Sequence, residues 1–187
     1  MKIVTFVFAL VLPALVTLAD TYKIDSAHSF IRFSVHHLFG TARGEFHRFS
    51  GTIEVDASQP EQSSVKAVIQ LSSIDTKIRK RDDHLLGTDF FDAARFPEIT
   101  FRSRSVKQTS SDSGNIPGEL TMHGVTHPLT LHVKLLMKNS TRTRWSVTTD
   151  PIHRKDFGLM FSGTAETISG IGQAVTPSIE IESVRAD

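Results

Sequence analysis

Apolar and polar residues alternate along most of the chain from residue 21 onwards, in short runs that turn residues separate. Residues 29–37 show this most clearly, because Ile31, Phe33 and Val35 share one face and the residues between them are polar. Alternation with a period of two is typical of a β-strand with one buried face. By the same pattern we expect further strands over residues 21–25, 45–56, 64–74, 99–106, 116–123, 125–138, 142–152, 159–168 and 174–184.

One stretch in the middle of the chain breaks this alternation. Residues 77–86 are highly charged and lack alternating β-branched residues. We therefore predict a short helix there and a helical turn near 89–94, which Pro97 ends. We expect the acidic residues of this stretch to cap helix ends and to accept hydrogen bonds from backbone amides, with Asp83 as one such cap.

The spacing of the strands indicates an all-β protein with antiparallel strands. Short strands at this spacing, with one helical insertion, predict either a sandwich or a closed barrel. No linker or long repeat divides the chain, so we expect a single domain that is long enough to bury a core.

The first 19 residues have the layout of a secretory signal peptide. Lys2 precedes a broken apolar run that ends in the small residue Ala19, and we expect cleavage after Ala19. The mature domain then covers residues 20–187. The run is too short and interrupted for a membrane span, which needs about 20 apolar residues. No later stretch is longer, so we expect no transmembrane segment in the mature chain.

Composition narrows the function classes. Removing residues 1–19 removes one basic residue, Lys2, and leaves 20 basic and 20 acidic residues. A balanced charge argues against a nucleic-acid partner, because phosphate binding needs clustered Lys and Arg. The chain has no cysteine, which excludes disulfides, a cysteine nucleophile and iron–sulfur sites.

The nine histidines raise the question of a metal site. His36 and His37 are adjacent in a predicted strand and point to opposite faces. His123, His127 and His132 fall in a strand–turn–strand context without a recognised ligand spacing. We therefore predict hydrogen-bonded or surface histidines, and neither a metal site nor a cofactor.

Evidence for catalysis is weak. The chain contains no G-x-S-x-G nucleophile motif. The run Asp82-Asp83-His84 has the residue types of an acid–base cluster, but it also fits the solvated face of a short helix. An enzyme of envelope metabolism that uses His and Asp residues of the segment 75–92 is the alternative function.

Phenylalanine is unusually frequent, with 13 Phe residues against one Trp and one Tyr. These residues occur in nearly every predicted element. They fit a packed core, and they equally fit the wall of an apolar lumen, since Phe adds apolar area without a polar atom. An eight-stranded barrel has room for either arrangement, and the sequence alone leaves both open.

A series of short motifs resembles the YceI-like family, which comprises exported bacterial proteins described as polyisoprenoid-binding. The resemblance covers nearly all of residues 22–184. Its most specific part is the central block. The motifs are His28-Ser29, Arg43-Gly44, Phe49-Ser50-Gly51-Thr52-Ile53, Ser73-Ile74-Asp75-Thr76, Arg81-Asp82-Asp83-His84-Leu85, Phe90-Phe91-Asp92, His123-Gly124-Val125-Thr126 and Asp156-Phe157-Gly158.

The resemblance implies a lipocalin-like antiparallel barrel of about eight strands that holds a long apolar lipid, such as an isoprenoid, a quinone-related lipid or a fatty acid. It implies no catalytic residue and a periplasmic location. It also implies a homodimer, which a barrel with an imperfectly paired edge at Pro177 would favour.

Candidate ligand contacts follow from the apolar faces and from the resemblance. We expect the lumen to be lined by Phe33, Val35, Phe49, Ile53, Phe90, Phe91 and Phe101. Candidates for contact with a polar head group, by residue type only, are His37, Arg43, His84 and Arg154. A structural role for each of these four is at least as plausible from the sequence.

Overall fold

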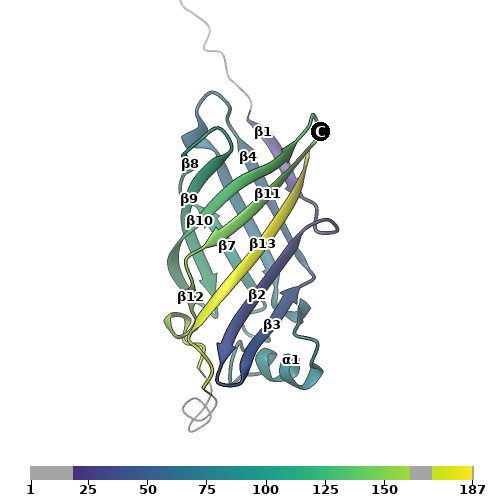
Figure 1. Ribbon diagram of the computed structural model, residues 1–187, viewed down its shortest axis with the longest axis vertical. Helices are drawn as coiled ribbons and strands as arrows, with labels where there is room; N and C mark the ends of the chain where they lie inside the picture. Colours follow the sequence, from purple (N-terminus) through teal and green to yellow (C-terminus); the bar gives the residue numbers. More distant parts are fainter. Residues whose placement is uncertain (1–18, 161–169, 187) are drawn as a thin grey trace, which may run out of the picture.

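The computed structural model describes residues 19–160 and 170–186 (Figure 1). The predicted signal peptide, apart from Ala19, lies outside the described residues. Most of the strand predicted over residues 159–168 lies outside them as well.

The described residues form strands and a few short helices. The strands are β1 Asp20–Ile24, β2 Phe30–His37, β3 Gly40–Phe46, β4 Phe49–Val55, β5 Ser64–Gln70, β6 Ile74–Asp75, β7 Glu98–Ser103, β8 Lys107–Gln108, β9 Ser113–Met122, β10 Val125–Lys138, β11 Arg142–Thr149, β12 Ile152–His153 and β13 Ala174–Arg185. The α-helix is α1 Arg79–Leu86, and 3₁₀ turns occur at Pro60–Gln62, Leu71–Ser73 and Arg154–Phe157.

Eight of these strands close into an antiparallel barrel, which is the fold class predicted. Their order is β1-β4-β5-β7-β9-β10-β11-β13, and β13 pairs with β1 to complete the ring. The long strand β13 uses its other half to pair with β2, which continues the sheet to β3 and β6. The ring is closed, and Pro177 lies opposite Phe33 in the β13–β2 ladder.

The strand predicted over residues 45–56 is wrong as a single element. Two strands meet there and break at His47 and Arg48: β3 pairs with β2, whereas β4 pairs with β1 and β5. The His47 N–H donates to Ser73 O (3.2 Å), and the Gln70 N–H donates to Arg48 O (2.9 Å). The break escaped prediction because these hydrogen bonds to residues distant in sequence decide it, and because β3 contains two glycines, Gly40 and Gly44, which weaken a strand pattern.

The β9–β10 hairpin is held by a two-residue turn. His123 and Gly124 have φ angles of 53° and 75°, and Met122 pairs with Val125 on either side of them. Positive φ at both turn positions matches the right-handed twist of the flanking strands. This hairpin confirms the two strands predicted on either side of Gly124.

Helix α1 lies at one end of the barrel (Figure 1). It falls inside the predicted range 77–86, and two hydrogen-bonded turns follow it before Pro97. Leu71, Phe90 and Phe91, which flank it in the sequence, are buried in the main apolar core. The segment 71–97 therefore covers this end of the barrel.

The predicted capping role of Asp83 is wrong. The N-cap of α1 is Ile78, which makes no side-chain capping bond, and the exposed Asp83 carboxylate only approaches Arg79 at 3.9 Å. Asp82 takes the structural role instead. Its Oδ1 accepts hydrogen bonds from the N–H (2.9 Å) and the hydroxyl (2.5 Å) of the buried Thr76.

We predict that Asp82→Ala lowers the free energy of unfolding by about 2 kcal/mol, because it leaves two donors of buried Thr76 without their acceptor. The matched change Asp83→Ala should stay within about 0.5 kcal/mol, as usual for an exposed position. Urea unfolding followed by circular dichroism measures both. Equal losses in the two variants would contradict this assignment.

Candidate functional site

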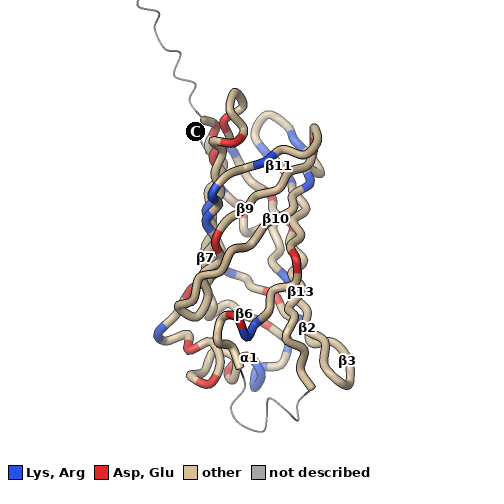
Figure 2. The backbone as a smooth tube through the Cα atoms, turned by 90° about the vertical axis from the view of Figure 1, so that its left-hand side faces the viewer, with Lys and Arg blue, Asp and Glu red and all other residues tan. Residues whose placement is uncertain are grey.

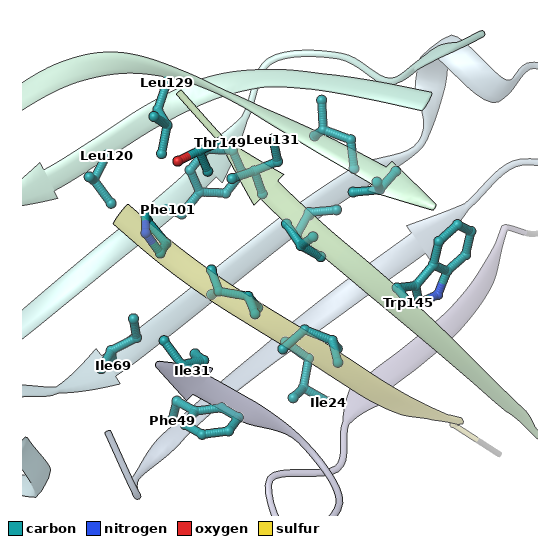
Figure 3. Close-up of a pocket in the computed structure, with 18 of the residues that line it drawn as sticks. Ile24, Ile31, Phe49, Ile69, Phe101, Leu120, Leu129, Leu131, Trp145 and Thr149 are labelled. Atoms are coloured by element: carbon teal, nitrogen blue, oxygen red, sulfur yellow. The ribbon is translucent and has the colours of Figure 1, made fainter. Parts of the chain in front are cut away.

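A cavity of about 630 Å³ runs through the interior of the barrel (Figure 3). At one end its wall includes residues of the loops near Asp56 and Ser111. At the other end it reaches Leu85 of α1, Phe91 and Leu159. The volume falls in the range of about 300–1,000 Å³ that is usual for small-molecule sites.

The strand alternation produces the wall. On β10 every second residue from Leu129 to Leu135 lines the cavity, and on β9 Ile116, Leu120 and Met122 do so. Side chains between them point outwards, because successive residues of a strand face opposite sides of the sheet. Figure 3 shows Phe49, Ile69, Phe101, Leu120 and Leu131 converging on the same space from different strands.

All seven residues expected in the lumen lie on this wall. They come from the strands β2, β4 and β7 and from the cover segment, and they are Phe33, Val35, Phe49, Ile53, Phe90, Phe91 and Phe101. Their contact with a ligand stays a prediction.

Two glycines make room for the aromatic rings. A Cβ at Gly118 would lie 2.5 Å from the Phe101 ring, and a Cβ at Gly44 would lie 2.4 Å from the Phe33 ring. Each ring thus occupies the space beside a glycine of a neighbouring strand, where any larger residue would clash with it. The rings of Phe33 and Phe101 thereby stay against the wall and leave the centre of the barrel open.

The polar atoms of one wall section bond to one another. The hydroxyls of Thr143 and Ser183 share a hydrogen bond of 2.7 Å, and Trp145 Nε1 donates to Thr143 Oγ1 at 2.8 Å. Buried polar groups must be paired to avoid a desolvation cost. Because these three pair within the wall, that section presents a largely apolar surface to the cavity.

The four head-group candidates occupy different places. Arg154 lines the cavity, whereas His37, Arg43 and His84 do not. The His37 ring accepts a hydrogen bond from the Phe39 N–H (3.3 Å), and Arg43 and His84 are exposed on β3 and α1. Residue type could not show which side of the barrel each candidate faces.

Arg154 has a structural role. Its side chain is buried, with the residue 2% exposed. It donates to the carbonyls of Leu159 (2.7 Å), Gly172 (3.1 Å) and Ile171 (3.3 Å). These bonds join two stretches of backbone beside the cavity.

Arg81 is a cavity residue that the sequence analysis missed. Arg81 lines the cavity, and its guanidinium donates to the hydroxyl and the carbonyl of Thr76, both at 2.8 Å. The available signal was its position in the Arg81-Asp82 motif, where Asp82 binds the same threonine. Arg81 and Asp82 together fix Thr76 at the covered end.

The acids and histidine of the segment 75–92 do not face the cavity. Its wall in this segment consists of Thr76, Arg81, Leu85, Phe90 and Phe91. The acid–base cluster required by the enzyme alternative is therefore not brought together in this cavity.

Two groups of possible metal ligands occur among the described residues, on the outside of the barrel: Asp25, His28 and Glu182, and Glu45, His47 and Asp75. A side-chain cation already occupies each. Arg142 binds Asp25 (3.0 Å) and Glu182 (2.5 Å), and Lys77 binds Glu45 (3.0 Å) and Asp75 (2.7 Å).

The Lys77 ammonium holds the pKa of Glu45 and of Asp75 below their usual values, and the two carboxylates raise the pKa of Lys77. A carboxyl group with a lowered pKa stabilises the fold at pH values above its pKa in the unfolded chain. This stabilisation is lost as the pH falls through its pKa in the folded protein. These groups therefore act as an ion-pair cluster that is intact at neutral pH.

The histidines at 123, 127 and 132 are hydrogen-bonded separately. His123 Nδ1 donates to Phe157 O (3.1 Å) and His127 Nε2 donates to Asp156 O (2.9 Å), since a carbonyl can only accept. His132 Nδ1 contacts Asn115 Oδ1 at 2.8 Å.

Within the described part of the chain, none of the helices has the length and apolar character needed to cross a bilayer.

We predict that Arg154→Met lowers the free energy of unfolding by about 3 kcal/mol, because one buried and two partly buried carbonyls lose their charged donor. Arg43→Met removes the same charge from an exposed position and should change stability by less than about 0.5 kcal/mol. Chemical denaturation measures both. An Arg154→Met variant that unfolds at the same denaturant concentration as the wild type would contradict this structural role of Arg154.

Comparison with known sequences gives a clear relationship. The chain matches the YceI-like domain family over residues 22–183. The Protein YceI of Escherichia coli O157:H7 and that of Salmonella newport (strain SL254) are each 40% identical to it over 121 residues. The aligned part covers 63% of this chain and 63% of each relative, so the chain matches less than two thirds of their length.

Solved structures share the fold. BcnA of Burkholderia cenocepacia superimposes with a TM-score of 0.77 at 24% identity, covering 85% of this chain and 98% of that one. A polyisoprenoid binding domain from Saccharophagus degradans gives a TM-score of 0.68 at 18% identity, covering 91% and 100%. The Campylobacter jejuni YCEI protein gives 0.68 at 25% identity, covering 81% and 90%.

Proposed function

Because the chain belongs to the YceI-like domain family, we propose that it is a periplasmic carrier that holds one long apolar lipid in the barrel cavity. The ligand class comprises polyisoprenoids, quinone-related lipids and fatty-acid-like chains. A relative of the same fold, the Saccharophagus degradans domain, is described as polyisoprenoid binding, which supports this class.

The observation that carries the proposal is the apolar wall. Aromatic and aliphatic side chains from nearly every strand of the ring face one elongated space. Burying a hydrocarbon there is favourable by roughly 25 cal/mol for each Å² of apolar surface removed from water. Such a wall selects for width and length of the chain more than for a particular chemical group, so selectivity within the class should be modest.

Polar contacts contribute less in this account. Arg154 already serves backbone carbonyls, and His37, Arg43 and His84 lie off the cavity wall. A polar end of the ligand therefore has no dedicated charged partner among the four predicted candidates.

We predict that Phe101→Trp obstructs the cavity and weakens binding of a conjugated polyene fatty acid by at least about tenfold, because extra ring volume in a packed wall costs about 1–3 kcal/mol or displaces the ligand. The matched control is Phe30→Trp, at an exposed position of β2. Fluorescence titration measures both, with circular dichroism as the check on folding.

Normal polyene binding by a folded Phe101→Trp variant would overturn the lumen account. Mass spectrometry of organic extracts from purified wild-type protein supplies the identity of the natural ligand. An extract without any long-chain lipid would argue against the carrier function.

Export is part of the proposal. We predict that the mature protein begins at Asp20, because the first 19 residues have the n-region, apolar run and small terminal residue of a signal peptide. N-terminal sequencing of protein from the periplasmic fraction measures this. Protein that retains Met1 in that fraction would refute it.

A homodimer also stays a proposal that rests on the family. An imperfectly paired edge at Pro177 gives this dimer little support, since the ring is closed and Pro177 is paired with Phe33 across β13 and β2.

A further inference from the structure

Large apolar side chains are exposed at the barrel end that carries α1. Phe39 is 92% exposed and Leu38 is 69% exposed, both in the turn between β2 and β3. Met160 is 50% exposed, and Ile78, just before α1, is 52% exposed. We call Leu38, Phe39 and Met160 the apolar tip. Figure 1 shows the β2–β3 turn and α1 at the same end of the barrel.

The turn itself is unusual in composition. His37 pairs with Gly40, which leaves Leu38 and Phe39 as the whole of a two-residue loop. Glycine, asparagine and aspartate are the usual residues there, because they suit the backbone and face water. Two large apolar residues gain nothing from that position in water. Exposed apolar residues that are grouped in this way commonly mark an interaction site.

The residues of the tip are joined through the backbone. The Leu38 side chain packs on Gly170, where a Cβ would lie 2.2 Å from Leu38 Cγ. The Gly172 N–H donates to His36 O at 2.7 Å. Arg154 then bonds both the Gly172 carbonyl and the carbonyl of Leu159, the residue before Met160. The tip is therefore carried on a braced end of the barrel.

The hairpin that carries Leu38 and Phe39 is basic. Residues 30–44 include Arg32 and Arg43 and no Asp or Glu, and Figure 2 shows no acidic residue at the β2–β3 turn. Lys80 is exposed on the first turn of α1 at the same end, in a segment of mixed charge that also exposes Asp83 and Asp89. A protruding apolar pair with flanking cations complements a surface that is apolar inside and anionic at its face.

We propose that this end of the protein docks on an anionic lipid bilayer, with Leu38 and Phe39 inserted among the headgroups and Arg43 and Lys80 at the level of the phosphates. Apolar insertion and attraction of cations to anionic lipids are the two contributions that hold peripheral proteins on membranes.

A second copy of the chain fits this surface less well. A stable protein interface buries about 800 Å² on each partner, whereas the tip consists of a few side chains, two of which project from a narrow hairpin. A projecting hairpin can enter a fluid lipid surface without any complementary shape in its partner.

The tip also adjoins the cavity. Val35 and Ala42, on the same hairpin, line the cavity wall, and so does Leu159 beside Met160. Docking would bring this end of the cavity to the bilayer. A role in lipid exchange rests on the proposed carrier function, but docking does not, so the two can fail separately.

Vesicle flotation tests the docking. The probe is vesicles of phosphatidylcholine with about one third phosphatidylglycerol at low salt. The double variant Leu38→Ser/Phe39→Ser should bind at least about tenfold less than wild type. The control is Leu136→Ser, which removes a 50% exposed leucine near the C-terminal end of β10, at the end of the barrel away from α1 (Figure 1). This variant should bind as wild type does. Phe39→Asn, which suits a turn, is the backup variant.

A second arm tests the charge. Arg43→Glu/Lys80→Glu should lower binding to anionic vesicles, and added salt should weaken wild-type binding, because exposed charges are screened.

Wild type that fails to float, a folded tip variant that floats normally, or Leu136→Ser losing as much binding would overturn the proposal. So would sedimentation showing that the tip variant dissociates a wild-type dimer, since a second copy would then be the occupant. Lipid in organic extracts of the tip variant shows that the cavity itself is intact.

Discussion

Closure of the strand ring is the constraint on which the rest of the structure depends. Once β1 pairs with both β4 and β13, no edge remains in the ring, and one side of every strand must face the interior. The residues on those sides are mostly apolar, and they leave about 630 Å³ unfilled. Gly44 and Gly118 make room for the rings of Phe33 and Phe101 at the wall. The same alternation that closes the fold thus also shapes the cavity.

The two kinds of polar burial in this barrel serve different purposes. Along the wall, Thr143, Ser183 and Trp145 bond one another and keep the lumen apolar. At the covered end, Arg81 and Asp82 hold Thr76, and Arg154 holds three backbone carbonyls. Charged side chains there, both donors and an acceptor, replace strand pairing where the chain leaves the ladder. Because a charge without partners is costly to bury, these networks fix one conformation of the end.

The strands and their inward faces could be predicted because alternation is local, but alternation left a sandwich and a barrel open, and the choice of a barrel came from the family resemblance. Phe49 and Phe101 could be placed in the lumen from the apolar face of their own strands. The break at His47 could not, because hydrogen bonds to Ser73 and Gln70, distant in sequence, decide it. The roles of Asp82 and Asp83 could not be separated, since both suit a cap and only the position of Thr76 distinguishes them. His37 and Arg43 were chosen by residue type, which carries no information about distance from the cavity.

The hairpin of β2 and β3 connects the proposed cavity function to the proposed docking surface. Val35 and Ala42 face the lumen, whereas Leu38 and Phe39, only a few residues away, face solvent. A long apolar lipid has very low concentration in free solution, because its transfer to water is unfavourable in proportion to its area. A carrier that waited for dissolved ligand would load slowly however well its wall fitted. A carrier that rests on the bilayer receives the ligand from the phase in which it is dissolved. An exposed apolar turn beside the cavity is unfavourable in water, but in such a carrier it serves the transfer of the ligand.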